Sequence, residues 1–240
     1  MSMQGLSVAV DVVMCIDVTA SMHPLIDMVK ANARRFHGDL VDACEKNDRI
    51  VSRLRVRVIG FRDLAYNQEK PRDSTHPHNG DAVFEESPFF ELPRQQGNLA
   101  AFLDRLDAAG GGDEPESGLE ALALALRSDW THEGERQRHV VVLWTDAPAH
   151  PIESRVAYRP AAYGDLPADL DELTEMWESG QGVTRLRGNA RRLVLYAPPE
   201  EPWMGLVDQW YLAMHYPSTA GKGLADQDYG EILNGIAKTI

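Results

Sequence analysis

The most constraining feature of the sequence is a long apolar run near its beginning that ends abruptly in polar residues. Residues 8–16 are almost entirely apolar and rich in β-branched side chains, and Asp17, Thr19 and Ser21 follow at alternating positions. A run that is apolar at consecutive positions is typical of a strand covered on both faces, as in the interior of a parallel sheet. The polar residues then lie at the carboxyl end of that strand, where open α/β sheets bind their ligands.

The side chains of this polar loop indicate which kind of ligand it binds. An aspartate, a threonine and a serine at alternating positions supply three hard oxygen atoms from one short segment. Small divalent cations such as Mg²⁺, Mn²⁺ and Ca²⁺ prefer ligands of this kind. We therefore expect a cation site here rather than a nucleophile for covalent catalysis.

Hydrophobic periodicity predicts strands and helices that alternate along the whole chain. The expected strands cover residues 8–17, 52–63, 84–92, 139–146, 193–197 and 211–216. The expected helices cover residues 24–45, 98–107, 115–130, 167–178, 203–210 and 229–240, and residues 64–82 are expected to form a loop.

This order of elements predicts an α/β fold with a doubly wound, mostly parallel six-stranded sheet and helices on both faces, a Rossmann-like arrangement. Residues 84–92 are expected to form the one antiparallel edge strand, because Pro88 cannot donate a ladder hydrogen bond. Arg53, Arg55 and Arg57 alternate with apolar residues in the second strand, which predicts a more exposed strand. No linker divides the chain, so we predict a single domain spanning residues 1–240.

Composition and charge narrow the classes of function. Hydrophobic residues at 43% and charged residues at 25% are ordinary for a folded globular chain. The formal net charge of -13 argues against a nucleic-acid partner, because binding to phosphate backbones needs a basic face. No run of about 18 or more apolar residues occurs, so no membrane association is expected. Cys15 and Cys44 are expected to be buried thiols in a reducing compartment, which favours a cytoplasmic protein.

Two further polar loops are expected at the same edge of the sheet. Residues 110–117 are rich in glycine and acidic residues and precede a helix, and residues 145–150 follow an apolar strand. The carboxyl ends of adjacent parallel strands meet at one edge, so the three loops are expected to converge there. The glycines allow the backbone of the second loop to approach closely.

Together these three segments resemble the motifs of the von Willebrand factor type A domain family. The segments are Asp-Val-Thr-Ala-Ser at 17–21, Gly-Gly-Gly-Asp-Glu-Pro-Glu at 110–116 and Trp-Thr-Asp-Ala-Pro at 144–148. The resemblance covers essentially the whole chain and is greater to intracellular, stand-alone members than to adhesion receptors. In that family an Asp-x-Ser-x-Ser motif, a threonine from a later loop and an aspartate from another strand end form a metal-ion-dependent adhesion site.

The resemblance implies a role for each matching residue. Thr19 and Ser21 would ligate the ion through their hydroxyl groups, and Asp17 and Asp146 would hold its waters and orient those hydroxyls. Thr19 stands where the family motif has serine and keeps the hydroxyl group. Asp113 stands where adhesion receptors carry the threonine, and is the fifth candidate ligand. Mg²⁺ is the expected ion, with Mn²⁺ or Ca²⁺ as alternatives.

Asp113 changes the charge balance of such a site. Two carboxylates around a dication form a neutral cluster, whereas three, from Asp17, Asp113 and Asp146, leave one net negative charge. At separations of about 4 Å and an effective dielectric constant of about 20, one extra charge is worth several kcal/mol. An Asp113 that reaches the ion is therefore expected to tighten metal binding and to weaken the attraction for a carboxylate of a partner.

Simpler interpretations of the same residues remain open. Asp17 or Ser21 alternatively caps the first helix, and Asp113 alternatively caps the helix that follows it. Glu114 and Glu116 suit the first turn of that second helix, where acidic side chains complement the helix dipole.

Several other residues are given structural interpretations. Asp63, at the end of the second strand, either supports the metal site or is a solvated loop end. His76 and His78 have no third ligand of the zinc type, so a solvated loop is expected. His23 and His150 flank the expected site as polar rim residues. Aromatic side chains expected in the core are Trp203, Trp210 and Tyr211.

These features predict a metal-dependent protein-binding module, not an enzyme, whose partner is another protein or a neighbouring domain. The alternative is a metal-dependent hydrolase or phosphatase that uses Asp17. A phosphatase of the haloacid dehalogenase type needs a second aspartate two residues later, where this chain has Thr19. The loop has no glycine for a nucleotide fingerprint, and Ser21 lacks the Gly-x-Ser-x-Gly elbow of serine hydrolases. A scaffold that keeps the fold without a functional site is a third possibility.

Overall fold

The computed structural model describes residues 7–64, 83–109, 115–179 and 186–240, and the strands in these ranges form one sheet. The strand order is β3-β2-β1-β5-β6-β7, and β4 also pairs with β2. The five longer strands run parallel, whereas the two short strands run antiparallel to β2. The strands are β1 (Ser7–Asp17), β2 (Ile50–Phe61), β3 (Phe84–Glu86), β4 (Phe90–Leu92), β5 (Gln137–Trp144), β6 (Arg191–Ala197) and β7 (Ala213–Pro217).

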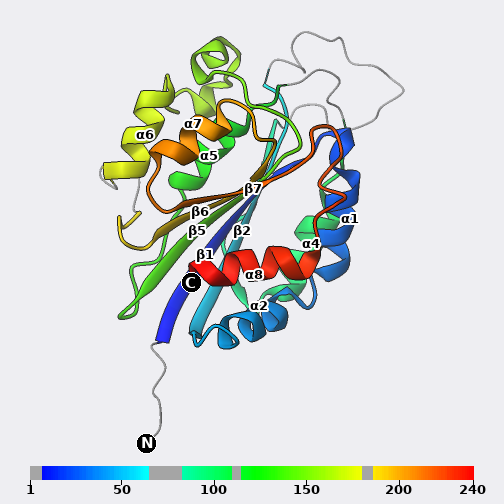
Figure 1. The fold of residues 1–240 in the computed structure, drawn as a ribbon, viewed down its shortest axis with the longest axis vertical. Coiled ribbons are helices and arrows are strands. Elements are labelled where there is room, and N and C mark those ends of the chain that lie inside the picture. The colour runs from blue at the N-terminus through cyan, green and yellow to red at the C-terminus, as the bar shows by residue number, and fades with distance from the viewer. Residues whose placement is uncertain (1–6, 65–82, 110–114, 180–185) are drawn as a thin grey trace, which may run out of the picture.

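β1 occupies the middle of this sheet (Figure 1). The chain first moves from β1 outward to β2, and later crosses to the other side of β1 to form β5, β6 and β7. The carboxyl end of β1 therefore lies where the order of the strands reverses, which is where open α/β sheets bind ligands. Every residue of β1 after Ser7 is buried, as its apolar sequence predicts.

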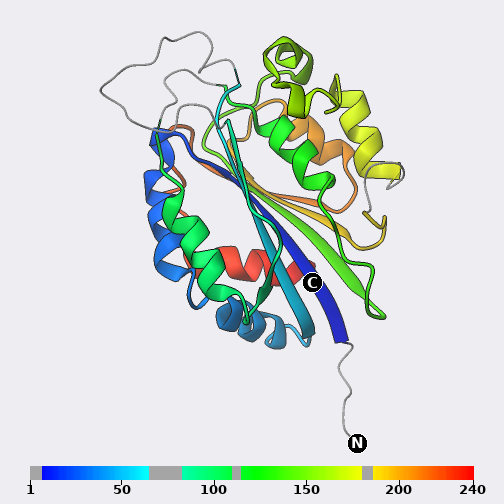
Figure 2. The same cartoon turned by 180° about the vertical axis from the view of Figure 1, so that it is seen from behind.

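Helices cover both faces of the sheet (Figures 1 and 2). α1, α2, α4 and α8 pack on one face around one apolar core, and α5, α6 and α7 pack on the other around a second core. Among the described residues, no helix is both long and apolar enough to cross a membrane. The helices are α1 (His23–Asn32), α2 (Phe36–Glu45), α4 (Gln96–Arg105), α5 (Gly118–Leu126), α6 (Leu170–Ser179), α7 (Trp203–Gln209) and α8 (Tyr229–Thr239), and the short 3₁₀ segments are η1 (Ala20–Met22), η2 (Ile152–Ser154), η3 (Val156–Tyr158) and η4 (Ala161–Tyr163).

The sheet has seven strands in the described residues, not the six predicted, because residues 84–92 form two short strands. The ladder to β2 is interrupted beside Pro88, which has no backbone N–H to donate. At the interruption the Ser87 hydroxyl accepts a hydrogen bond from the backbone N–H of Val58 at 2.8 Å. The prediction of an antiparallel edge is confirmed, whereas the prediction that residues 84–92 form one continuous strand is wrong.

Two predicted helices also differ in their extent. The segment predicted as one helix at 24–45 contains α1 and α2, which are separated by a turn at residues 33–35. The helix predicted from residue 115 begins only at Gly118. The backbone N–H of Glu116 donates to Pro148 O at 3.0 Å and the residue forms a β-bridge with Ala149, so Glu116 precedes the helix.

β2 is more exposed than β1, as predicted, but its three alternating arginines are only partly exposed and are paired with carboxylates. Arg55 donates from Nε to Asp11 Oδ1 at 2.8 Å and from an Nη atom to Asp11 Oδ2 at 2.5 Å. Asp11, in the middle of β1, is fully buried and also accepts from the Thr131 N–H at 2.7 Å. A bidentate arginine and a backbone donor satisfy this buried charge, which allows it to interrupt an otherwise apolar strand.

The buried side chains agree with most of the sequence predictions. Trp203 and Trp210 are buried, and both cysteines are free buried thiols. Tyr211 was wrongly predicted to be a core residue, because 76% of its surface is exposed. It lies in the turn after α7, directly before Leu212, whose φ of 69° reverses the chain into β7.

Candidate functional site

The loop after β1 is organised by the carboxylate of Asp17. Asp17 Oδ1 accepts two hydrogen bonds from Thr19, one from the backbone N–H at 2.9 Å and one from Oγ1 at 2.7 Å. An aspartate that binds the backbone two residues further on makes a compact turn at the end of the strand. Both residues are buried, so the turn and its hydroxyl group are held in a fixed position.

The second oxygen of Asp17 is held by the neighbouring strand. The parallel register places Ile16 beside Trp144, so Thr145 follows β5 next to Asp17. Thr145 Oγ1 donates to Asp17 Oδ2 at 2.8 Å. Thr145 belongs to the predicted third loop, in which no role was predicted for it, and its position opposite Asp17 follows only from the strand register.

Ser21 and Asp146 join loops that are 125 residues apart in the sequence. Ser21 Oγ donates to Asp146 Oδ1 at 2.9 Å. Thr19 Oγ1 and Ser21 Oγ lie 3.4 Å apart. Four of the five predicted site residues, Asp17, Thr19, Ser21 and Asp146, therefore form one connected group of oxygen atoms at the carboxyl end of β1 and β5. The fifth, Asp113, lies outside the described residues.

A third segment, between β7 and α8, completes the surroundings of Asp146 and was not anticipated from the sequence. The backbone N–H of Gly223 donates to Asp146 Oδ2 at 2.7 Å, and that of Gly221 donates to the Asp146 carbonyl at 3.0 Å. Gly223 has a φ of +57°, and a Cβ atom there would lie 2.0 Å from the carbonyl oxygen of Ser21. Only glycine fits this position. The Gly-Lys-Gly segment at 221–223 is therefore the sequence feature that could have indicated a close backbone approach here.

Burial has the largest effect on the ionisation of Asp17, and the neighbouring carboxylate of Asp146 adds to it. Burial raises the pKa of Asp17 to about 6, hydrogen bonds from Thr19 and Thr145 lower it by less, and the negative charge of Asp146 raises it further. Negative charge at this position is therefore only partly compensated by the protein's own donors, which makes it a favourable environment for a cation.

The arrangement of oxygen atoms fits a small divalent cation. Both hydroxyl groups can donate their protons to carboxylates, which leaves their lone pairs for a metal ion. Neighbouring oxygens on an octahedral Mg²⁺ lie about 3 Å apart, and somewhat farther apart on Ca²⁺, which compares with 3.4 Å between the Thr19 and Ser21 oxygens. No group of three or more His, Cys, Asp or Glu side chains within the described ranges could hold a metal ion, so such a site would depend on hydroxyl groups.

Helix capping does not account for Asp17 or Ser21. The residues at the N-caps of η1 and α1 are Thr19 and Met22, and neither cap has a side-chain hydrogen bond. The oxygens of Asp17 are bound to Thr19 and Thr145, and the Ser21 hydroxyl is bound to Asp146. The capping alternative considered from the sequence is therefore wrong for these two residues.

Asp63 belongs to a separate polar cluster at the end of β2. Asp63 Oδ1 accepts from Ser117 Oγ at 3.3 Å and from Arg155 Nε at 3.1 Å, and lies 3.6 Å from His150 Nε2. Arg155 also donates to the ring of His150. Ser117 Oγ in turn accepts from the N–H of Leu64 at 3.0 Å. This cluster fixes the loops around residues 64, 117 and 155, and places His150 beside Asp63.

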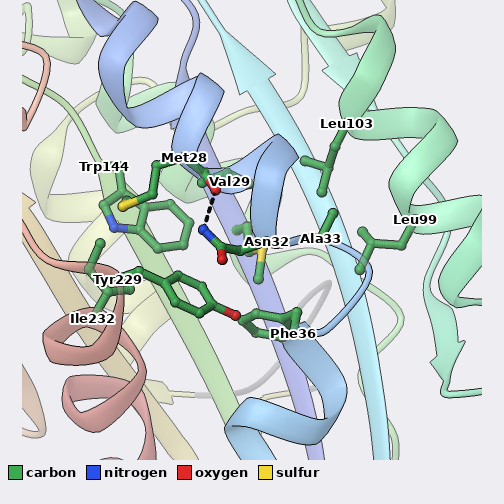
Figure 3. Close-up of a pocket in the computed structure, with 11 residues that line it drawn as sticks. Met28, Val29, Asn32, Ala33, Phe36, Leu99, Leu103, Trp144, Tyr229 and Ile232 are labelled. Atoms are coloured by element: carbon green, nitrogen blue, oxygen red, sulfur yellow. Dashed lines mark hydrogen bonds between the residues drawn. The ribbon is translucent and has the colours of Figure 1, made fainter.

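A small apolar cavity lies apart from both polar clusters, between α1, α2, α4, α8 and β5 (Figure 3). Its volume is about 20 Å³, and its lining includes Met28, Phe36, Leu103 and Trp144. The one polar contact drawn there is the Asn32 side chain donating to the Met28 carbonyl at 2.7 Å. Nothing in this lining resembles a cation site or a catalytic group, so we assign it no chemistry.

Comparisons with known proteins identify relatives by fold alone. No protein-family model matches the sequence, and no curated protein matches it. A crystal structure of the pilus adhesin SpaC from Lactobacillus rhamnosus GG, in its open conformation, is similar with a TM-score of 0.50 and 14% identity over 95% of this chain. A second SpaC structure gives a TM-score of 0.50 and 13% identity over 95% of this chain.

The chain matches only part of these adhesins, 29% and 30% of the SpaC chains. Proximal thread matrix protein 1 from the mussel byssus is also similar, with 11% identity over 95% of this chain and 46% of that protein, but its TM-score of 0.42 is too low to support an argument. At these identities the SpaC likeness shows a shared fold and does not show a shared function.

Proposed function

We propose that this protein is a metal-dependent protein-binding module of the von Willebrand factor type A kind. In this proposal a divalent cation, Mg²⁺ in the first place, binds at the carboxyl ends of β1 and β5. Thr19 and Ser21 supply hydroxyl ligands, Asp17 and Asp146 orient them and hold metal-bound waters, and Asp113 is a further candidate ligand. The partner is another protein or a neighbouring domain.

The observation that carries the proposal is the hydrogen bond between Ser21 Oγ and Asp146 Oδ1, at 2.9 Å. It joins loops from two strands and leaves the hydroxyl groups of Thr19 and Ser21 facing each other at 3.4 Å. Thr145 and Gly223 hold the outer oxygens of the two carboxylates, so the group does not need to be assembled by the ion. The likeness of the fold to part of an adhesin is compatible with this role and supports it weakly.

The hydrolase alternative is less well supported. Asp17 is fully buried, and its two oxygens accept three hydrogen bonds from Thr19 and Thr145. A nucleophilic carboxylate needs access to its substrate, and these contacts instead suit an orienting role. Turnover of small aryl phosphates in Mg²⁺ that is lost in Asp17→Asn would nevertheless overturn our choice of a binding module over an enzyme.

The metal site is tested by thermal unfolding with and without Mg²⁺. A ligand at one hundred times its dissociation constant stabilises by about 2.7 kcal/mol, which is roughly 5–10 °C for a chain of this size. We expect a shift of this order in the wild type and its loss in Ser21→Ala. Ser154→Ala removes another exposed serine hydroxyl and should keep the shift. An equal Mg²⁺ shift in wild type and Ser21→Ala would refute the assignment.

The binding role is tested by a pull-down with the purified protein as bait. We expect a partner that is retained in Mg²⁺, released by EDTA, and recovered when Mg²⁺ is added back. The same partner should be absent with Ser21→Ala and present with Ser154→Ala. A partner held equally by all baits and unaffected by EDTA would show that binding does not use this site.

A further inference from the structure

Four arginines gather at the opposite end of the sheet, where the parallel strands begin. Arg138 lies at the start of β5 and Arg192 at the start of β6, while Arg49 and Arg136 directly precede β2 and β5. Arg192 lies beside Val140 in the parallel register of β5 and β6. Val140 faces the core under α2 and α8, and Arg138 lies two residues before it. Side chains two residues apart share a face of a strand, so Arg138 and Arg192 lie on the same face.

Three of these arginines line a cavity at this end of the sheet. The cavity has a volume of about 100 Å³, whereas a single water needs on the order of 10–15 Å³ of such space. It is bounded by the start of β1, by the turn between α2 and β2, by β5 and by the end of α8. The lining residues are Val8, Asp48, Arg49, Arg136, Arg138 and Ile240.

None of the four arginines forms an ion pair with a carboxylate of the described residues. Arg138 donates from one Nη atom to the Gln137 carbonyl at 3.0 Å, and its buried Nε has no hydrogen-bond partner in the part of the chain that the structure describes. Within the described ranges, the hydrogen bonds of Arg192 go to backbone carbonyls, those of Asn189 and Arg191. Guanidinium donors therefore remain available at this cavity.

The arginines of β2 differ from these four, because each of them has a carboxylate partner. In β2, Arg53 forms ion pairs with Glu91 and Glu133. Arg55 pairs with Asp11, and Arg57 pairs with Glu86. A chain with a formal net charge of -13 has enough carboxylates to pair every arginine. The four arginines at the amino end of the sheet nevertheless have no carboxylate partner among the described residues.

The arginines are close enough to repel one another. The pKa of Arg138 is lowered, first by burial and then by the positive charges of Arg49 and Arg136. The pKa of Arg192 is lowered by burial and by the charge of Arg138. Asp48 has the one acidic side chain in the lining of the cavity, and the terminal carboxylate of Ile240 adds a second negative charge, so the four arginines keep an excess of positive charge.

We propose that this arginine cavity binds a phosphate group. Planar guanidinium groups match the oxygen spacing of tetrahedral oxyanions and form charge-assisted hydrogen bonds with them. A phosphate dianion offsets two of the uncompensated charges, whereas a carboxylate offsets only one. The cavity volume of about 100 Å³ is large enough for a phosphate group. This site is independent of the proposed metal site, which lies at the other end of the strands.

The test measures thermal unfolding in EDTA with sodium phosphate, glycerol 3-phosphate, sodium acetate or sodium chloride at equal ionic strength. We expect phosphate to stabilise the wild type above chloride and acetate. Hydrogen bonds to charged groups predict about a tenfold or larger loss of apparent phosphate affinity in Arg138→Gln. Arg136→Gln is a second variant, because that side chain is exposed and its loss should not impair folding. Arg53→Gln removes the same charge from β2 and should keep the wild-type response.

Each outcome decides the proposal. A phosphate response in the wild type that is lost in Arg138→Gln and Arg136→Gln and kept in Arg53→Gln supports it. Equal stabilisation by glycerol 3-phosphate assigns the site to phosphate esters as well, whereas a response to inorganic phosphate alone assigns it to the free ion. An absent phosphate response, an equal response to acetate, or an equal loss in Arg53→Gln overturns it.

Discussion

At the carboxyl end of the parallel strands, buried carboxylates are surrounded by hydroxyl groups and backbone donors that hold each oxygen in place. Asp17 and Asp146 are bound by Thr19, Ser21, Thr145 and the N–H of Gly223. At the amino end, arginines line an open cavity, and no carboxylate of the described residues pairs with them. We propose that the first end binds a cation through its oxygen atoms and that the second binds an anion through its guanidinium donors.

This difference shows that the overall charge of a chain says little about its sites. The formal net charge of -13 argues against a nucleic-acid partner, yet the arginines give the amino end a positive local charge. The parallel sheet separates the two environments, because all of its long strands begin at one end and finish at the other. Mutations at the buried carboxyl end should therefore have large effects on folding, and those at the exposed amino end small ones.

The largest effect is expected for Gly223→Ala at the carboxyl end. The new Cβ would lie 2.0 Å from the Ser21 carbonyl oxygen, at a φ of +57° that alanine disfavours. The loop must move, which breaks the hydrogen bond to Asp146, so we expect about 3–5 kcal/mol lower unfolding free energy in urea. The Mg²⁺-dependent shift should disappear as well.

Gly38→Ala is the matched control for this change. Gly38 lies in α2, and a Cβ there would meet no atom within 4 Å. Alanine should stabilise the helix by about 0.5–1 kcal/mol and leave the Mg²⁺ response unchanged. Wild-type stability and metal response in Gly223→Ala would contradict the tight packing that we describe around Asp146.

A second prediction concerns Glu120, a buried carboxylate in the first turn of α5. Arg159 donates to Glu120 Oε1 at 3.4 Å. Burial raises the pKa of Glu120 to about 7, and its backbone hydrogen bond and the charge of Arg159 oppose this shift. Because the pKa is raised in the folded state, the resulting stabilisation is fully present below about pH 4.5 and is lost as the pH rises through about 7.

Glu120→Gln removes this titration. We expect the decrease in unfolding free energy between pH 5 and pH 8 to become smaller by up to about 3 kcal/mol. The measurement is urea unfolding at several pH values, with Glu153→Gln as a control in an exposed glutamate. Identical pH profiles for wild type and Glu120→Gln would show that Glu120 ionises normally in the folded protein.

The fold was largely predictable because apolar periodicity reports burial directly. The central position of β1 followed from its continuous apolar run, and the antiparallel edge followed from Pro88. The break between α1 and α2 and the late start of α5 did not, because the apolar pattern continues through the turn and a backbone bridge involving Glu116 depends on tertiary contacts. The ion pair of Asp11 could not be predicted either, because its partner Arg55 is 44 residues away in the sequence.

The site was predictable where its residues follow strands in a recognisable pattern. Asp17, Thr19, Ser21 and Asp146 were expected together, and hydrogen bonds join them. Asp113 lies outside the described residues, so its role stays a prediction. The contributions of Thr145 and Gly223 depend on strand register and on a loop that returns from the far side of the sheet. The arginine cavity was missed because its members are spread over 143 residues, from Arg49 to Arg192, without a motif.

The most direct test of the metal site is the position of an ion in crystals soaked with Mn²⁺. We predict an anomalous peak within about 2.5 Å of both Thr19 Oγ1 and Ser21 Oγ, and no such peak in Ser21→Ala crystals under the same conditions. A peak at another place, or none at these two hydroxyl groups in the wild type, would contradict a cation site at the carboxyl end of β1.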